Sequence, residues 1–191
     1  MAEAETSGDG PPDAERAAET RLYAFLATHG IAWQHTTHPP LFTVEDSRAL
    51  RGTIPGAHVK NMFLKEKKGG LWLVTCRETR QIRIRDLERE IGAKGCSFAK
   101  PELLWEVLGV RPGAVTPFAA LNDTERRVGI VLDRQILGEA AIAAHPLHNR
   151  ATTTIALADL RRFFALTGHA PLEVDFDALE ARAAAQAAER P

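Results

Sequence analysis

A lysine and an asparagine stand side by side in a largely apolar run of the chain. They are Lys60 and Asn61, within the segment from Gly56 to Lys65. Lysine is almost never fully buried unless its ammonium group is paired, so an inward-facing Lys60 needs an anion, a carbonyl or a substrate. The alternative is a surface lysine on an edge strand, where lysine blocks pairing with other chains. The pattern alone leaves both interpretations open.

Glycine and polar positions further along the chain form a second candidate group. They are the loop from Gly113 to Pro117, His145 and Asn149. Glycine lets the backbone approach a ligand closely, and successive loop N–H groups form anion-binding nests. The alternatives are an ordinary turn for the loop and a hydrogen-bonded structural histidine for His145. From the residues alone, the chain is a small domain with a pocket suited to an anionic ligand.

Several well-known catalytic motifs are absent from the sequence. There is no GxGxxG, no P-loop, no GxSxG and no HExxH. His35 and His38, and likewise His145 and His148, are three residues apart. Each pair lies beside a proline, and no carboxylate or thiolate stands at the usual ligand spacing. The sequence therefore predicts no metal site.

Composition is that of an ordinary globular domain. The 191 residues are 45% hydrophobic and 26% charged, with 24 basic against 25 acidic side chains, which excludes a polycation but allows a local basic face. Two cysteines outside any CxxC pair, Cys76 and Cys96, argue against a disulfide framework or a zinc site. No stretch approaches the about 18 apolar residues that span a bilayer, and the acidic N-terminus is no signal peptide. We expect no membrane association and a cytoplasmic location.

Short strands and helices alternate along the chain. Two apolar runs around a glycine-containing tip, over 56–65 and 71–76, predict a β-hairpin. Alternation puts His58, Lys60, Met62 and Leu64 on one face of its first strand and Val59, Asn61 and Phe63 on the other. Other strands are predicted over 31–36, 96–99, 128–133, 141–147 and 152–157, and helices over 14–29, 43–50, 86–91, 102–108, 134–137, 159–166 and 177–191.

These elements predict one α/β or α+β domain with a mixed sheet. We expect a disordered tail over residues 1–13, a folded domain over 14–178 and an Ala-rich tail or frayed helix over 179–191.

Six segments of the sequence are similar to those of a known family. They are His38 to Glu45, Val59 to Leu64, Gly109 to Phe118, Leu132-Asp133, His145 to Asn149, and Thr167 to Pro171. In this order, from about Leu22 to Phe176, they resemble the YbaK/ProX-like family of prolyl-tRNA editing domains. The last segment resembles the free-standing ProX (PrdX) branch.

The resemblance implies a barrel-like mixed sheet surrounded by helices and an aminoacyl-tRNA deacylase without cofactor or metal. For the ProX branch the implied substrate is alanyl-tRNA(Pro). A synthetase site built for proline cannot strongly exclude a smaller amino acid, because missing methylenes are worth only about 1–3 kcal/mol, so a second site hydrolyses the error. Two alternatives stay open: a deacylase for cysteinyl-tRNA(Pro) or another small misacylated tRNA, and a non-catalytic module that binds tRNA or a synthetase.

Residue roles follow from the resemblance as well. Lys60 corresponds to the key lysine, which holds the terminal adenosine of tRNA, and the Gly113 backbone approaches the aminoacyl carbonyl or the attacking water. The implied substrate-binding residues are Asn61, Pro117, Phe118, His145 and Asn149. No side chain is an obvious general base, and the ribose hydroxyl beside the ester is implied to activate water. His148 departs from the smaller or neutral residues common at its position.

A basic surface for RNA is expected near the hairpin tip. The candidates are Lys65, Lys67 and Lys68, with Arg77, Arg80, Arg83 and Arg85 beyond the second strand. A solvated charged face is the alternative for many of them. The implied partners are the acceptor end of tRNA(Pro) and prolyl-tRNA synthetase.

Overall fold

Strand β2 (Ala57–Lys65) is the centre of the sheet. It pairs antiparallel with β3 (Leu71–Arg77), which completes the predicted hairpin. Its first residues pair in parallel with β6 (Ala141–Ala144), and its end pairs with the short β4 (Ser97–Phe98). β2 therefore lies inside the sheet order, with β3 along most of its length and with β6 and β4 beside its first and last residues only.

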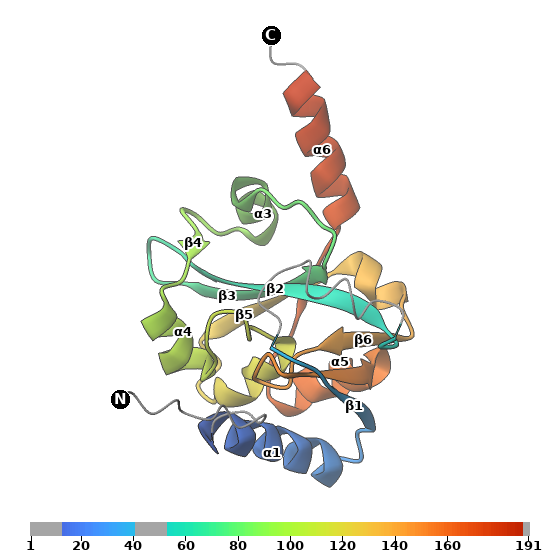
Figure 1. Cartoon of the computed structure of the whole chain (residues 1–191). Helices are drawn as coiled ribbons and strands as arrows, with labels where there is room; N and C mark the ends of the chain where they lie inside the picture. Colours follow the sequence, from blue (N-terminus) through green and yellow to red (C-terminus); the bar gives the residue numbers. More distant parts are fainter. Residues whose placement is uncertain (1–12, 41–52, 189–191) are drawn as a thin grey trace, which may run out of the picture.

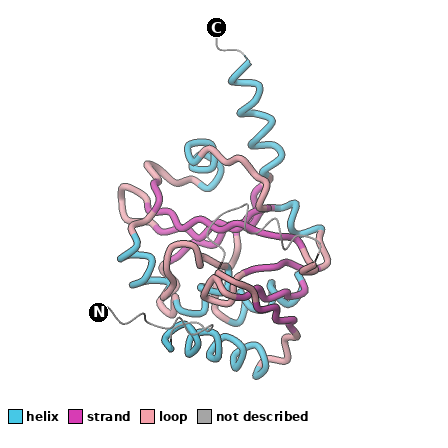
Figure 2. The backbone as a smooth tube through the Cα atoms, in the orientation of Figure 1, coloured by secondary structure: helices cyan, strands magenta, loops and turns pink. Residues whose placement is uncertain are grey.

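The computed structural model describes residues 13–40 and 53–188. Within them the sheet has eight strands in the order β1-β7-β6-β2-β3-β5-β8, with β4 beside β2. The strands not yet given are β1 (Trp33–Thr37), β5 (Val128–Asp133), β7 (Ala151–Ala156) and β8 (Leu172–Val174). Parallel and antiparallel pairs both occur, which confirms the mixed sheet. The sheet folds over, so that β6 and β1 lie below β2 and β3 in the view of Figure 1. Figure 2 shows the same fold of the strands in the backbone alone.

Helices lie on both sides of this folded sheet (Figure 1). They are α1 (Asp13–Thr28), α3 (Ile84–Ile91), α4 (Pro101–Leu108), α5 (Leu157–Leu166) and α6 (Phe176–Ala188), with 3-10 turns η1 (Pro117–Asn122) and η2 (Arg134–Gly138). The larger apolar core includes residues of α1, α4, α5 and η1. A second core lies under α3 and α6. The arrangement is a single mixed α/β domain, as predicted.

The alternation of side chains on β2 places its residues in the two cores as expected. Phe63 and Val59 pack in the larger core, whereas Leu64 and Met62 pack in the second. Lys60 therefore has its side chain on the side of the second core, and Asn61 on the side of the first.

Some predicted boundaries differ from the structure. The strand expected over 141–147 ends at Ala144, because Pro146 has no N–H to extend the ladder. The sequence did not predict β8, nor the η1 turn, which Thr116 caps by accepting from the Phe118 N–H. The helix expected over 43–50 lies outside the described residues, as does the tail apart from Asp13, which begins α1.

Helix α6 projects from the body of the domain in Figure 1. Its first turns carry its buried residues, Phe176 and Leu179, and the rest of the helix extends away from the sheet. Within the described ranges, none of the helices combines the length and apolar character needed to cross a bilayer.

Candidate functional site

Lys60 is half-buried in the interior of the sheet, opposite Cys76 of β3. At Lys60 the paired neighbour of β2 is β3, and the side chain is half-buried, which favours an inward-facing lysine over an exposed edge-blocking one. Its Nζ donates a hydrogen bond to the main-chain oxygen of Arg80. The acceptor of this hydrogen bond is a neutral carbonyl. Among the described residues, this contact therefore does not neutralise the positive charge of the Lys60 ammonium group.

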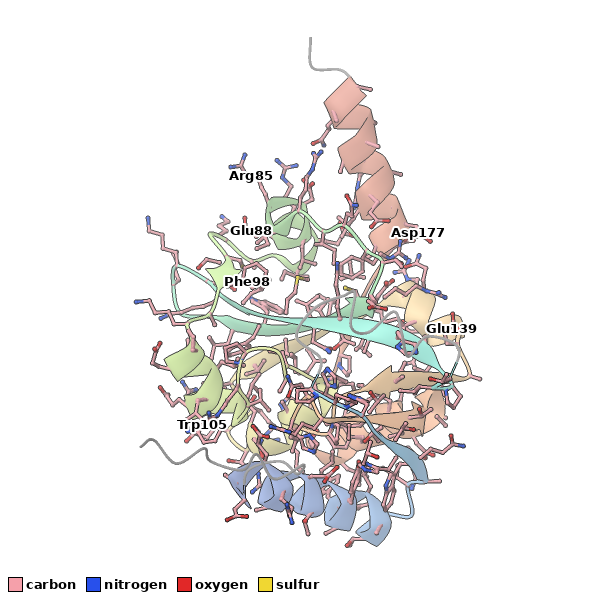
Figure 3. All side chains as sticks on the ribbon, viewed as in Figure 1. Arg85, Glu88, Phe98, Trp105, Glu139 and Asp177 are labelled. Atoms are coloured by element: carbon pink, nitrogen blue, oxygen red, sulfur yellow. The ribbon has the colours of Figure 1, made fainter. Side chains whose placement is uncertain are left out.

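The carbonyl that receives Lys60 belongs to a residue held by buried charges. The Arg80 side chain is 8% exposed and Asp133, at the end of β5, is fully buried. Arg80 Nε donates to Asp133 Oδ2 over 2.9 Å, and Nη1 donates to Asp177 and to Glu180 Oε2, the latter over 2.9 Å. Figure 3 shows Asp177 at the end of α6 nearest the sheet. The network joins three elements beneath Lys60.

Arg80 was a candidate for RNA binding on sequence grounds, and that prediction is wrong. Its guanidinium is used by three carboxylates and is shielded from solvent. Arg77 is half-buried and pairs with Glu139. Arg83 and Arg85 are exposed, and Figure 3 shows Arg85 on the outer side of α3.

The lysines of the hairpin tip lie in solvent. Lys65, Lys67 and Lys68 are all exposed, at the end of β2 and in the turn that follows. Because the tip is far along the strand from Lys60, these lysines form a surface separate from the candidate site. They stay predicted RNA contacts.

Asn61 is held on the opposite face of β2 from Lys60. Its Oδ1 accepts a hydrogen bond of 2.7 Å from Thr75 Oγ1, the hydroxyl directly across the hairpin. Thr75 is buried. The carboxamide of Asn61 is therefore fixed, as a positioning role requires, and it does not share a face with Lys60.

The loop around Gly113 meets the loop around Asn149. Gly113 is exposed and has a φ of +86°, a left-handed conformation that favours glycine. A Cβ built at Gly113 would lie 3.8 Å from Asn149 Nδ2. That is ordinary contact, so the backbone conformation and not the available space selects glycine. The structure brings these two predicted site residues together.

Pro117 and Phe118 support the loop from inside. Pro117 is buried at the start of η1, and Phe118 is fully buried, with its ring 5.6 Å from that of Phe163 in an edge-on contact. The ring of Phe118 gains free energy by joining the apolar core. The expected contact of Phe118 with substrate stays a prediction, and in this structure its side chain supports the loop from within.

His145 is half-buried where β6 ends. Its Nδ1 lies 3.0 Å from the carbonyl oxygen of Ala151. Because a carbonyl only accepts hydrogen bonds, Nδ1 carries the proton and Nε2 of the neutral ring is left with a lone pair. Burial lowers the pKa of His145 below its ordinary value, so the ring stays neutral near pH 7.

His38 lies beside His145, with ring centroids 6.2 Å apart. Its Nδ1 contacts the Pro39 carbonyl over 2.8 Å, and its Nε2 contacts Thr152 Oγ1 over 2.9 Å. Burial also lowers the pKa of His38. Two neutral imidazoles therefore lie side by side, each in the residue after a strand ends, and of the two only His145 was a predicted site residue.

A pocket of about 480 Å³ adjoins these histidines. It is lined by Glu19, His35, Thr37, His38, Pro39, Pro40, His148, Arg150 and Ala151. His148, the unexpected residue of the family segment, is buried with Nε2 3.3 Å from Glu19 Oε1. Its Nδ1 accepts from the Arg150 N–H, whereas Nε2 and Glu19 Oε1 are close without forming a hydrogen bond. His148 thus links the Asn149 loop to α1.

The histidines and cysteines of the described residues are held by other contacts. Across the described ranges, no group of three His, Cys, Asp or Glu side chains is arranged to hold a metal ion. Cys76 is fully buried in the second core, and burial raises the pKa of its thiol to about 12. It is a small core residue, as predicted, and not a nucleophile.

Sequence reasoning missed the residues that support the site. They include Thr116 at the start of η1, Glu19 beneath His148, and the Arg80–Asp133–Glu180 network. One signal was visible: Asp133 comes directly after five residues of an apolar strand. A carboxylate there is buried unless the chain turns outward, so it needs a cationic partner.

Comparison with known proteins agrees with this arrangement. The family model described as aminoacyl-tRNA editing domain matches residues 38–163. Prolyl-tRNA synthetase associated domain-containing protein 1 of Danio rerio is 38% identical over 179 residues, which cover 93% of this chain and 97% of that protein. Prolyl-tRNA editing protein ProX of Acetoanaerobium sticklandii is 32% identical over 153 residues, 80% of this chain and 93% of that protein.

A solved structure of a candidate trans-editing enzyme for prolyl-tRNA synthetase has the same fold. Its TM-score is 0.65 at 20% identity, over 87% of this chain and 99% of the other. The family matches cover His38, the β2–β3 hairpin and the loops of Gly113 and Asn149. The resemblance seen in the sequence is confirmed, and this chain belongs to the aminoacyl-tRNA editing domain family.

Proposed function

We propose that the chain is a trans-editing deacylase that hydrolyses alanyl-tRNA(Pro) to alanine and free tRNA. The observation that carries the proposal is the half-buried ammonium of Lys60, whose charge meets a neutral carbonyl among the described residues. Such a group has charge left to offer an anion. The similarity to Prolyl-tRNA editing protein ProX supports tRNA as the source of that anion.

In this proposal the two sides of the site bind different parts of the substrate. Lys60 contacts the phosphate or ribose of the terminal adenosine. The exposed Gly113 backbone approaches the ester carbonyl, where a donor aimed at the developing oxyanion is commonly worth about 3 kcal/mol. Asn149, in contact range of Gly113, orients the same group.

His145 suits the amino-acid end of the substrate. Its neutral ring keeps an Nε2 lone pair, which accepts a hydrogen bond from the α-ammonium group of the aminoacyl ester. A protonated histidine would repel that group. The reaction then adds water to the ester carbonyl and expels the ribose oxygen, and the neighbouring ribose hydroxyl activates the water.

The first test is hydrolysis of alanyl-, cysteinyl- and prolyl-tRNA(Pro) by the purified protein and by Lys60→Ala. We expect rapid loss of the alanyl ester only, and a rate at least about 100-fold lower in the variant. Lys94→Ala is the matched control, because Lys94 is an exposed lysine outside the site. Equal rates for wild type and Lys60→Ala would refute the role of Lys60.

The same panel separates the alternatives. Preference for the cysteinyl ester would leave the proposed mechanism unchanged and would mean that the amino-acid pocket selects cysteine instead of alanine. The second class is a non-catalytic module that binds tRNA or a synthetase, and the Danio rerio relative is named for a domain associated with prolyl-tRNA synthetase. Binding of tRNA or synthetase without hydrolysis of any ester would support that class. Because tRNA charging supplies the substrate, we place the reaction in the cytoplasm.

A further inference from the structure

We propose that Glu180 of α6 is a positioning residue for Lys60, which it reaches through one peptide bond. The inference rests on the proposed role of Lys60 in the reaction. It assigns a function to the base of the projecting helix, far along the sequence from the residues of the editing motif.

The peptide bond between Arg80 and Gln81 is held from both ends. Its carbonyl oxygen, that of Arg80, accepts from Lys60 Nζ. Its N–H, that of Gln81, donates to Glu180 Oε1 over 2.9 Å. A trans peptide is planar, with C=O and N–H pointing in opposite directions. Any rotation of the N–H away from Glu180 therefore turns the carbonyl away from Lys60.

Glu180 holds the same residue a second time. Its other oxygen, Oε2, accepts from Arg80 Nη1 over 2.9 Å, while Asp133 fixes Nε of the same guanidinium. Charge-assisted bonds of this kind are about twice as strong as neutral ones. One carboxylate thus fixes both the side chain of Arg80 and the peptide plane that follows it.

A purely structural role would be the attachment of α6 to the domain. That attachment does not depend on Glu180 alone, because Phe176 and Leu179 are buried beneath the helix. Arg182 also ties α6 to α3 through Glu90 over 2.7 Å. The Arg182 pair belongs to the same helix and does not touch Arg80 or Lys60, so it is a matched control.

The experiment measures single-turnover hydrolysis of alanyl-tRNA(Pro) at saturating enzyme. Glu180→Ala should lower the rate about 10-fold, since misplacement of a site residue by about 1 Å costs up to about 100-fold. Glu180→Gln keeps an oxygen that accepts from the Gln81 N–H and should recover to within about threefold of wild type. Arg182→Ala should leave the rate unchanged. A loss in Arg182→Ala equal to that in Glu180→Ala would overturn the proposal.

A second readout is independent of activity. The ¹⁵Nζ–H signal of Lys60, assigned by its loss in Lys60→Ala, should be visible in the wild type because the carbonyl of Arg80 slows proton exchange. It should broaden or vanish in Glu180→Ala and persist in Arg182→Ala. An unchanged signal in Glu180→Ala would refute the link. If the wild type hydrolyses no ester, the proposed function fails, and this signal still decides whether Glu180 positions Lys60.

Discussion

The two sides of the candidate site are held by different kinds of interaction. Lys60 stands on β2, and the carbonyl that accepts from its ammonium group belongs to Arg80, which pairs with the buried Asp133 and the half-buried Glu180. The other candidate residues lie on two loops, where Gly113 has a φ of +86° and Leu147 a φ of +71°. These two residues are held by their backbone conformation and not by charged side chains.

Leu147 shows how the loop side is stabilised. A left-handed leucine costs free energy that glycine would not, yet its side chain is buried in the larger core. The packing of that side chain compensates for the backbone strain and fixes the direction of the next residues, His148 and Asn149. Strained residues of this kind cluster at functional sites. The two sides should therefore respond to different substitutions.

The largest effect is expected on the charged side. Asp133→Asn leaves the buried Arg80 without its main counter-charge, and breaking a buried ion pair commonly costs about 3 kcal/mol or more. We expect the free energy of unfolding, measured in urea, to fall by about 3 kcal/mol. The hydrolysis rate per folded molecule should also fall, since the carbonyl beneath Lys60 loses its support.

Asp123→Asn is the matched control for this variant. Asp123 is also a buried carboxylate, and it accepts hydrogen bonds from the Arg127 and Val128 N–H groups. Its Oδ2 lies 3.2 Å from Nε2 of His169, a residue of the Thr167–Pro171 segment. It should lose stability without loss of rate per folded molecule. Equal loss of rate in both variants would show that stability alone explains the effect.

On the loop side, Gly113→Ala should cost less stability and still lower the rate. The available space accepts a Cβ, at 3.8 Å from Asn149, so the cost is the positive φ, roughly 1 kcal/mol. We expect about a 10-fold lower rate, because the loop relaxes away from the ester. Gly30→Ala has a similar φ of +62°, with nothing within 4 Å. It should lose similar stability and keep the wild-type rate.

Much of the fold was predictable because local patterns and packing agree. The hairpin around Gly69, the helix ends at Gly92 and Gly109, and strand β5 all follow from periodicity and glycine positions. β8 was missed because it has only three residues and takes its conformation from β5. A strand that short has no periodicity of its own.

The site was predictable only in part, for a physical reason. Lys60, Gly113 and Asn149 stand out as residue types at odds with their surroundings. Phe118 was predicted to bind substrate because of its place in a motif, whereas in the structure its ring is fully buried. Arg80 and Glu180 are about a hundred residues apart, and charge alone predicts exposure for both. Their pairing depends on where α6 crosses the sheet, which the sequence does not encode locally.

Measuring the free energy of unfolding over a pH series should distinguish the histidines near the loops from the charged residues around Lys60. Burial lowers the pKa of His145 and of His38, whereas histidines of the unfolded chain titrate near about 6.5. As pH falls below that value, the unfolded state binds more protons than the folded state, so stability decreases. We expect the unfolding free energy to fall between pH 7 and 5, and the rate of hydrolysis to fall with it.

The variant His145→Asn tests whether His145 causes this decrease of unfolding free energy with falling pH. Asparagine does not titrate, so the variant should show a smaller decrease of unfolding free energy over the same pH range. A slope identical to that of the wild type would assign the pH dependence to groups other than His145.

The smallest effect is expected outside both sides, at the hairpin tip. Lys67 and Lys68 are exposed and lie in the turn after β2, so they contribute to RNA affinity and not to the positioning of Lys60. Replacement of both by alanine should raise KM for alanyl-tRNA(Pro) a few-fold and reduce the salt dependence, since each phosphate contact contributes about 0.7–0.9 to the slope of log affinity against log salt. The value of kcat should not change. A fall in kcat at constant KM would place the tip within the reacting site, whereas an unchanged salt slope would identify these lysines as a solvated charged face.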